Sequence, residues 1–177
     1  MRLLIRSLSV AALTLAVAAS SACGPEVDLA KATELVDVST GYYDMGIVNG
    51  KTKIVPQAIV HVKNVSDRSL PGFQMTASYW IVGDDGMKDE KLVPHSVAKD
   101  LAPGATSDAI VLRANFGFTP EMARAEAFNS SYFRDFKIKV FGKVNGKIAK
   151  LGEISVDRKI VPKDGSSLSK DQTNPTK

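Results

Sequence analysis

The sequence predicts an all-β protein, built as an antiparallel β-sandwich of about seven strands with one short connecting helix. Three observations lead to this prediction. Several short segments alternate apolar and polar residues, turns rich in glycine and proline separate them, and a single segment has helical signals. Short strands at this spacing, without helices between them, are typical of two packed antiparallel sheets.

The strand pattern is clear in five segments, 58–64, 73–82, 108–113, 136–144 and 153–161. A period of two directs alternate side chains to opposite faces of a sheet. The side chains expected to point into the core are Val60, Val62, Phe73, Met75, Tyr79, Ile110, Leu112, Ile138, Val140, Ile154 and Val156. Ile160 continues the same phase in the last segment.

Turn and cap residues support this reading. Asn145-Gly146 lies between two strand patterns, where a two-residue hairpin needs positive φ at both positions. In 102–105, Pro103 and Gly104 occupy the positions that a type II turn requires. The helical segment is 119–128, with Thr119 as its expected N-cap.

The N-terminus has the pattern of a secretory signal. Arg2 and Arg6 precede a short apolar run at 8–19, and small residues follow. The run is shorter than the roughly 20 apolar residues that cross a bilayer. We therefore expect a cleaved signal helix over 1–22.

Cys23, the single cysteine, follows directly. The segment 20–23 resembles a bacterial lipobox, although Ser20 stands where Leu, Val or Ile is usual. The resemblance implies acylation of Cys23 and attachment to a membrane through the lipid, which also removes a free thiol from an oxidising compartment. Gly24 stands where an Asp would signal inner-membrane retention under the enteric-type sorting rule. In a host with two membranes, this favours the outer membrane, facing the periplasm. Cleavage by ordinary signal peptidase would instead give a soluble periplasmic or secreted protein.

The chain divides into four parts: a signal peptide at 1–22, a lipidated N-terminus and tether at 23–32, the sandwich at 33–161, and a tail at 162–177. The tail is polar and rich in Gly, Ser and Pro, so we expect it to be disordered. Removing Arg2 and Arg6 from the 23 Lys and Arg leaves 21 against 19 Asp and Glu. This balance argues against a nucleic-acid partner.

A family resemblance appears once these segments are in order. The run "IVHVKNVSDRSLPGFQMTASYW" and the later "LAPGATSDAIVL" resemble the small immunoglobulin-like, FxLYD-like domains of bacterial envelope lipoproteins. The segments "GYYDMGIVNGKTKIVP" and "KLGEISVDRKIV" also resemble an uncharacterised exported family. The resemblance implies an immunoglobulin-like sandwich without the inter-sheet disulfide of antibody domains. It implies little about function.

Candidate chemistry is sparse. His61 and His95 lie on different segments, so we expect no metal site, and no cofactor is implied. The acidic segment 84–90 lacks the spacing of a calcium loop, which favours a solvated hairpin tip. Asn64-Val65-Ser66 matches a glycosylation sequon, but an Asx-type turn is the preferred interpretation.

Four aromatic residues are the candidate partner-binding residues: Tyr42, Tyr43, Phe116 and Phe118. One of the two tyrosines should be in the core and the other partly exposed. Exposed aromatic residues often anchor partners or glycans, and the alternative is that these four close the open end of the sandwich. The sequence thus predicts a non-enzymatic, lipid-anchored interaction module for an envelope protein. The alternative is a module that binds carbohydrate or peptidoglycan.

Overall fold

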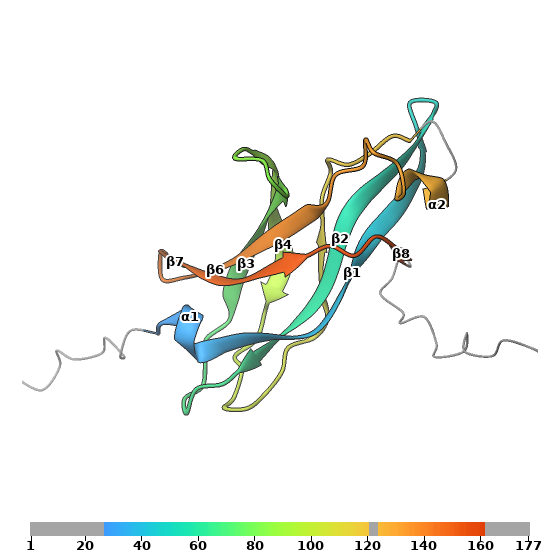
Figure 1. Cartoon of the computed structure of the whole chain (residues 1–177). Coiled ribbons are helices and arrows are strands. Elements are labelled where there is room, and N and C mark those ends of the chain that lie inside the picture. The colour runs from blue at the N-terminus through green and yellow to red at the C-terminus, as the bar shows by residue number, and fades with distance from the viewer. Residues whose placement is uncertain (1–26, 121–123, 162–177) are drawn as a thin grey trace, which may run out of the picture.

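The computed structural model describes residues 27–120 and 124–161. The expected signal peptide, Cys23 and the tail at 162–177 lie outside the described residues. The elements are α1 (Leu29–Ala32), β1 (Thr33–Val48), β2 (Lys51–Asn64), β3 (Phe73–Ile81), β4 (Met87–Val97), β5 (Ile110–Arg113), α2 (Arg124–Ala127), β6 (Phe136–Val144), β7 (Lys147–Ser155) and β8 (Ile160–Val161). Figure 1 shows the strands as two layers that face each other.

The two layers form a β-sandwich. One sheet has the strand order β5-β2-β1-β8 and the other has the order β4-β3-β6-β7. All neighbouring strands are antiparallel except β1 and β8, which are parallel. In a constant-type antibody domain the fourth strand lies beside the fifth. Here β4 joins β3 instead, and β8 is added beside β1, so each sheet has four strands.

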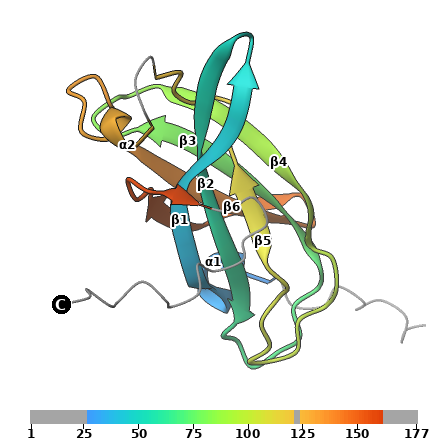
Figure 2. The ribbon, with the colours of Figure 1, turned by 90° about the vertical axis from the view of Figure 1, so that its right-hand side faces the viewer.

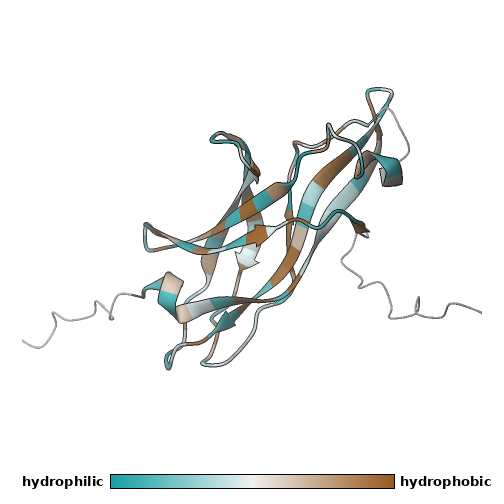
Figure 3. Ribbon diagram, in the orientation of Figure 1, coloured by the Kyte–Doolittle hydropathy of each residue, from teal (hydrophilic) through white to brown (hydrophobic). Residues whose placement is uncertain are grey.

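The predicted strand phase is confirmed. Each of the eleven side chains expected to point inward is buried, with exposed fractions between 0% and 8%. The hydropathy colours along β6 alternate in Figure 3, as the sequence 136–144 requires. One core therefore lies between the sheets, and it includes residues from both of them.

The prediction of one last strand over 153–161 is partly wrong. β7 ends at Ser155, and the chain crosses to the other sheet before β8 pairs with Tyr42 and Tyr43 of β1. The crossing changes the phase, so Val161 is buried and Ile160 is 36% exposed. A single alternating strand over 153–161 therefore does not form.

The helix expected at 119–128 is found in part. Helix α2 covers Arg124–Ala127, Thr119 and Pro120 are not helical, and 121–123 lie outside the described residues.

A second helix, α1, lies in the N-terminal segment that was expected to be a tether. Leu29 and Ala32 of α1 are 2% and 8% exposed, so this turn belongs to the folded domain. The domain therefore begins before Thr33.

Several strands are longer than the sequence pattern indicates. β1 and β2 form one long antiparallel hairpin, which extends beyond the neighbouring strands in Figure 2. Its turn is Asn49-Gly50, with φ of 52° and 77°. Asn145-Gly146 has φ of 49° and 79° and closes the β6–β7 hairpin as predicted.

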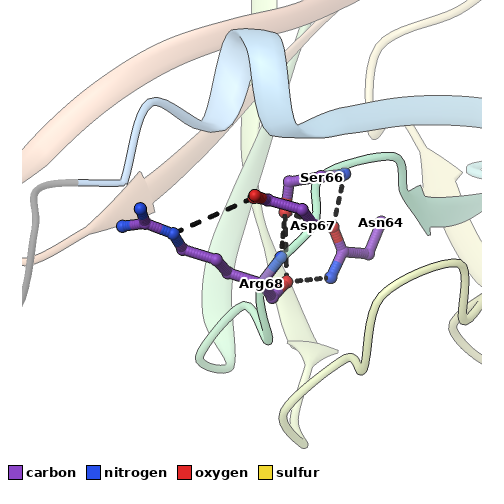
Figure 4. A network of polar contacts seen from close by, with 4 residues as sticks. All are labelled: Asn64, Ser66, Asp67 and Arg68. Atoms are coloured by element: carbon purple, nitrogen blue, oxygen red, sulfur yellow. Dashed lines mark hydrogen bonds and ion pairs between the residues drawn. The ribbon is translucent and has the colours of Figure 1, made fainter.

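The turn after β2 is held by the side chain of Asn64, which has no exposed surface. Its amide donates to the carbonyl oxygens of Arg68 at 2.7 Å and Leu101 at 2.8 Å. Its carbonyl oxygen accepts from the backbone N–H and the hydroxyl of Ser66, and Figure 4 shows the contacts with Ser66 and Arg68. The Asx-type turn is confirmed. An amide with all these bonds is not available for glycosylation in the folded state.

Candidate binding surface

A cluster of aromatic rings closes the end of the sandwich that lies beside the β1–β2 hairpin. Phe136, at the start of β6, has no exposed surface. Its ring centroid lies 6.5 Å from that of Tyr42, 6.1 Å from that of Phe116 and 5.8 Å from that of Phe118. Three of the four candidate aromatic residues therefore meet around one buried ring.

The two tyrosines have different environments, as their neighbouring positions in a strand predict. Tyr42 is fully buried, and its ring packs against Phe128 and Phe133. Burial, with an added contribution from the charge of Asp135, raises the pKa of its hydroxyl above the ordinary value, so the group stays protonated.

Tyr43 lies on the opposite face of β1 and is half-buried. The guanidinium carbon of Arg113 lies 3.7 Å from its ring centroid, and the Nε of Arg113 donates to the side-chain oxygen of Gln57 at 2.5 Å. Tyr43 is thus covered by a cation–π contact and lies apart from the aromatic cluster. Both tyrosines lie in the middle of a strand and not in a loop.

Phe116 and Phe118 lie on the segment that follows β5. Phe116 is 43% exposed, whereas Phe118 is half-buried and stacks on Phe133 at 4.5 Å. The carboxylate of Asp89 accepts from the backbone N–H groups of Asn115 at 2.6 Å and Phe116 at 3.2 Å. An edge residue of β4 therefore fixes the position at which Phe116 is presented.

The hairpin and a later turn add exposed apolar groups at the same end. Ile47 is 77% exposed and Met45 is 41% exposed, both close to the hairpin turn. A hollow of about 320 Å³ between the hairpin and Phe116 is lined by Val48, Lys51, Lys53, Phe116 and Gly117. Tyr132, next in sequence to Phe133, is 85% exposed. We call Met45, Ile47, Phe116, Phe118 and Tyr132 the far-end surface.

Hydrogen bonds from Arg158 stabilise the turn that contains Tyr132. Its guanidinium makes two hydrogen bonds to the carboxylate of Asp135, at 2.7 Å and 2.9 Å, and donates to the carbonyl oxygen of Phe128 at 2.8 Å. The Arg158 hydrogen bond lowers the pKa of the Asp135 carboxyl from its ordinary value. The aromatic-rich turn is therefore held on both sides by one side chain.

The sequence did not indicate Ile47, Tyr132, Asp89 or Arg158 as site residues. Asn49-Gly50 is the same hairpin signal as Asn145-Gly146, and it could have placed Ile47 near an exposed turn. Tyr132 and Arg158 lie in irregular segments, where no periodic pattern distinguishes an exposed side chain from a buried one.

The other candidate groups are dispersed. His61 lies on β2, where its Nδ1 is 2.9 Å from the carbonyl oxygen of Ser107, and His95 lies on β4 in the other sheet. Asp84 pairs with Lys88 at 2.9 Å. Over 27–120 and 124–161, no three His, Cys, Asp or Glu residues converge as a metal site would require. Neither described helix has the length and apolar character to cross a membrane.

No family model and no curated protein matches the chain. Among solved structures, it is similar to the alkylpurine DNA glycosylase AlkC of Pseudomonas fluorescens bound to DNA containing an abasic site analog. The TM-score is 0.36 and the identity 12%, over 72% of this chain and 30% of that chain. It is also similar to the exo β-N-acetylglucosaminidase of Vibrio harveyi in complex with N-acetylglucosamine. There the TM-score is 0.27 and the identity 15%, over 73% of this chain and 18% of that chain.

Proposed function

We propose that this chain is a lipid-anchored envelope protein without catalytic activity, whose β-sandwich binds another envelope protein through the far-end surface. The observation that supports this proposal is that several exposed apolar side chains lie at one end of the sandwich. The most prominent are Ile47, Phe116 and Tyr132. Central aromatic and aliphatic side chains of this kind supply much of the binding energy in protein interfaces.

The position of this surface suits an anchored protein. β1 begins directly after α1 and has 16 residues, so the hairpin turn lies about 50 Å along the strand from α1. Cys23 precedes the first described residue, Val27, by four positions. Acyl chains on Cys23 would hold the α1 end near the bilayer, leaving the far-end surface accessible to a partner.

The anchor is tested by mass spectrometry of the N-terminal peptide from the native host. We expect a diacyl- or triacyl-modified Cys23 as the first residue. We also expect a Cys23→Ser protein to leave the membrane fraction. An unmodified cysteine, or a Cys23→Ser protein that stays in the membrane, contradicts the anchor.

The surface is tested by site-specific crosslinking in the native host. Photoreactive groups at 47 and 132 should give a common crosslinked product, whereas a group at Val65 should not. Val65 is 48% exposed and lies beside α1, where its backbone N–H donates to the carbonyl oxygen of Ala32 at 2.9 Å, so it provides the matched control. In the double variant Ile47→Ser, Phe116→Ser, a photoreactive group at 132 should no longer give the crosslinked product. Equal crosslinking from all three positions, or intact capture by a stable double variant, contradicts the surface.

A glycan-binding role has one supporting observation. Neither candidate tyrosine offers an open ring to a glycan, because Tyr42 is buried and Arg113 lies over the ring of Tyr43. Tyr132 remains as an exposed ring beside an apolar pocket of about 290 Å³, whose lining includes Phe118 and Phe133. Sedimentation with purified peptidoglycan tests this alternative. Binding that is lost in Tyr132→Ala would support it, and a protein that stays in the supernatant would exclude it.

A further inference from the structure

The β6–β7 turn carries a concentration of positive charge. The segment 143–150 reads KVNGKIAK, and its three lysines, Lys143, Lys147 and Lys150, are exposed. Ile148 lies among them and is 68% exposed. An exposed apolar side chain among lysines favours binding to an interface that has anionic groups at its surface and an apolar layer beneath them.

This turn lies beside the point at which the chain enters the domain. α1 packs against β7, and Leu29 of α1 lies against Gly142, where an added Cβ would be 3.0 Å from its Cδ1. Lys31 of α1 has a side chain that is 87% exposed. Figure 1 shows α1 close to the β6–β7 turn. We call Lys31, Lys143, Lys147, Ile148 and Lys150 the basic turn surface.

Carboxylates also lie near these lysines. Asp28 lies 3.5 Å from the amino group of Lys31, and Glu153 lies 2.9 Å from that of Lys150. Glu90 lines one hollow together with Lys143 and Ile148. The segment 143–150 itself has three lysines and no acidic residue, so the turn is a local concentration of positive charge.

We propose that the basic turn surface docks on the anionic phospholipid headgroups of the membrane that carries the anchor. This inference rests on the proposed acylation of Cys23. The four steps from Cys23 to Val27 span at most about 14 Å, so the anchor keeps the start of α1 near the headgroups. Lysines near an anionic bilayer each strengthen binding by roughly fivefold, and Ile148 adds apolar contact with the interface.

The chain contains a natural comparison for this surface. The β1–β2 hairpin has the same Val-Asn-Gly-Lys sequence at 48–51, with Ile47 at 77% exposed and with Lys51 and Lys53 after the turn. It lies about 50 Å along β1 from α1. Docking beside the anchor requires the β6–β7 turn and leaves the hairpin lysines without a role in membrane contact.

The test uses the mature chain with Cys23→Ser, so that headgroup binding is measured without the lipid. Sedimentation is compared between vesicles of phosphatidylcholine and vesicles that contain about 30% phosphatidylglycerol. We expect binding only to the anionic vesicles, and we expect it to weaken as salt rises from about 0.05 M to about 0.5 M. The double variant Lys143→Glu, Lys147→Glu should bind at least roughly 25-fold more weakly.

The matched control is Lys51→Glu, Lys53→Glu, which makes the same change of charge on the other hairpin and should bind within a few-fold of the parent. Thermal unfolding of both variants shows that they are folded. The proposal is overturned if the parent shows no preference for anionic vesicles. It is also overturned if the two double variants lose binding equally, since net charge alone would then explain it. Neither result bears on acylation, which mass spectrometry measures separately.

Discussion

Ile138 and Lys139 are adjacent on β6 but differ in environment. Ile138 has no exposed surface, whereas the Nζ of Lys139 lies 3.8 Å from the ring centroid of Trp80 on the outer face of the sheet. We expect Ile138→Ala to lower the free energy of unfolding by about 2–5 kcal/mol, because it leaves a cavity in the core. Lys139→Ala should cost no more than about 1 kcal/mol, the value of an exposed cation–π contact.

Denaturant titration of the two variants measures both values. Similar midpoints for Ile138→Ala and Lys139→Ala would contradict the strand phase of β6, and with it the assignment of the inner face.

Asp135 gives the protein a specific response to acid. Its pKa is lowered by the hydrogen bond from Arg158, so the folded state binds fewer protons there than the unfolded state does. The stabilisation is complete above the unfolded pKa of about 3.9 and is lost as the pH falls through the folded pKa. We expect Asp135→Asn to be less stable than the parent at about pH 7 and to lose less stability on acidification to about pH 3.

Thermal midpoints at the two pH values measure this difference. Asp67→Asn is the control, since its carboxylate is 91% exposed and lies 3.9 Å from the Nε of Arg68. An Asp135→Asn protein that loses as much stability in acid as the parent would contradict a role for this pair.

At the scale of elements, the segment after β5 depends on a glycine at its contact with β2. Ile54 and Phe118 exchange backbone hydrogen bonds of 2.9 Å and 2.8 Å across this contact. A Cβ on Gly117 would overlap the carbonyl oxygen of Ile54 and lie 2.8 Å from the Cα of Val55. We expect Gly117→Ala to cost at least about 1–3 kcal/mol, because backbone atoms must move apart.

Gly86 is the matched control for this prediction. The nearest heavy atom to an added Cβ there is the Nζ of Lys88 at 3.8 Å, at the end of a flexible side chain. Gly86→Ala should be neutral or stabilising by up to about 1 kcal/mol, since alanine restricts the unfolded chain. Equal thermal midpoints for the two variants would contradict the close approach at Gly117.

The sequence predicted those elements whose alternation is regular. β3 and β6 keep a strict period of two, and their inward residues could be read directly. β1 has register shifts after Val36 and Asp44, which break the period. Along β2, Ile54, Val55, Pro56 and Gln57 are all buried, because neighbouring side chains cover both faces. Neither departure is visible without knowing the neighbouring strands.

The candidate site was predictable to a similar degree. The alternation rule correctly separated the environments of Tyr42 and Tyr43, and the chain does bring Phe116 and Phe118 together with Tyr42. Tyr43 is separated from them because position 43 faces the other side of β1. Phe128 and Phe133 complete the cluster from an irregular turn, where only the tertiary fold determines which rings meet.

At the scale of the whole molecule, the two sheets share one core and should unfold together. Trp80 is the single tryptophan and reports on the sheet that contains β3. We expect the thermal transition followed by Trp80 fluorescence to coincide with the loss of far-ultraviolet circular dichroism, which reports on both sheets. A fluorescence transition at a clearly lower temperature would contradict a single cooperative unit.

The edge strand β4 carries charged side chains that affect whether two copies of the protein can pair through their sheet edges. Asp89 and Lys91 lie opposite Tyr79 and Ala77, at inward positions of the outermost strand. Charges directed inward on an edge strand oppose the addition of a strand from another molecule. In a chain anchored in a membrane as proposed above, copies would meet far more often than in solution, and these two residues would oppose edge-to-edge pairing at β4.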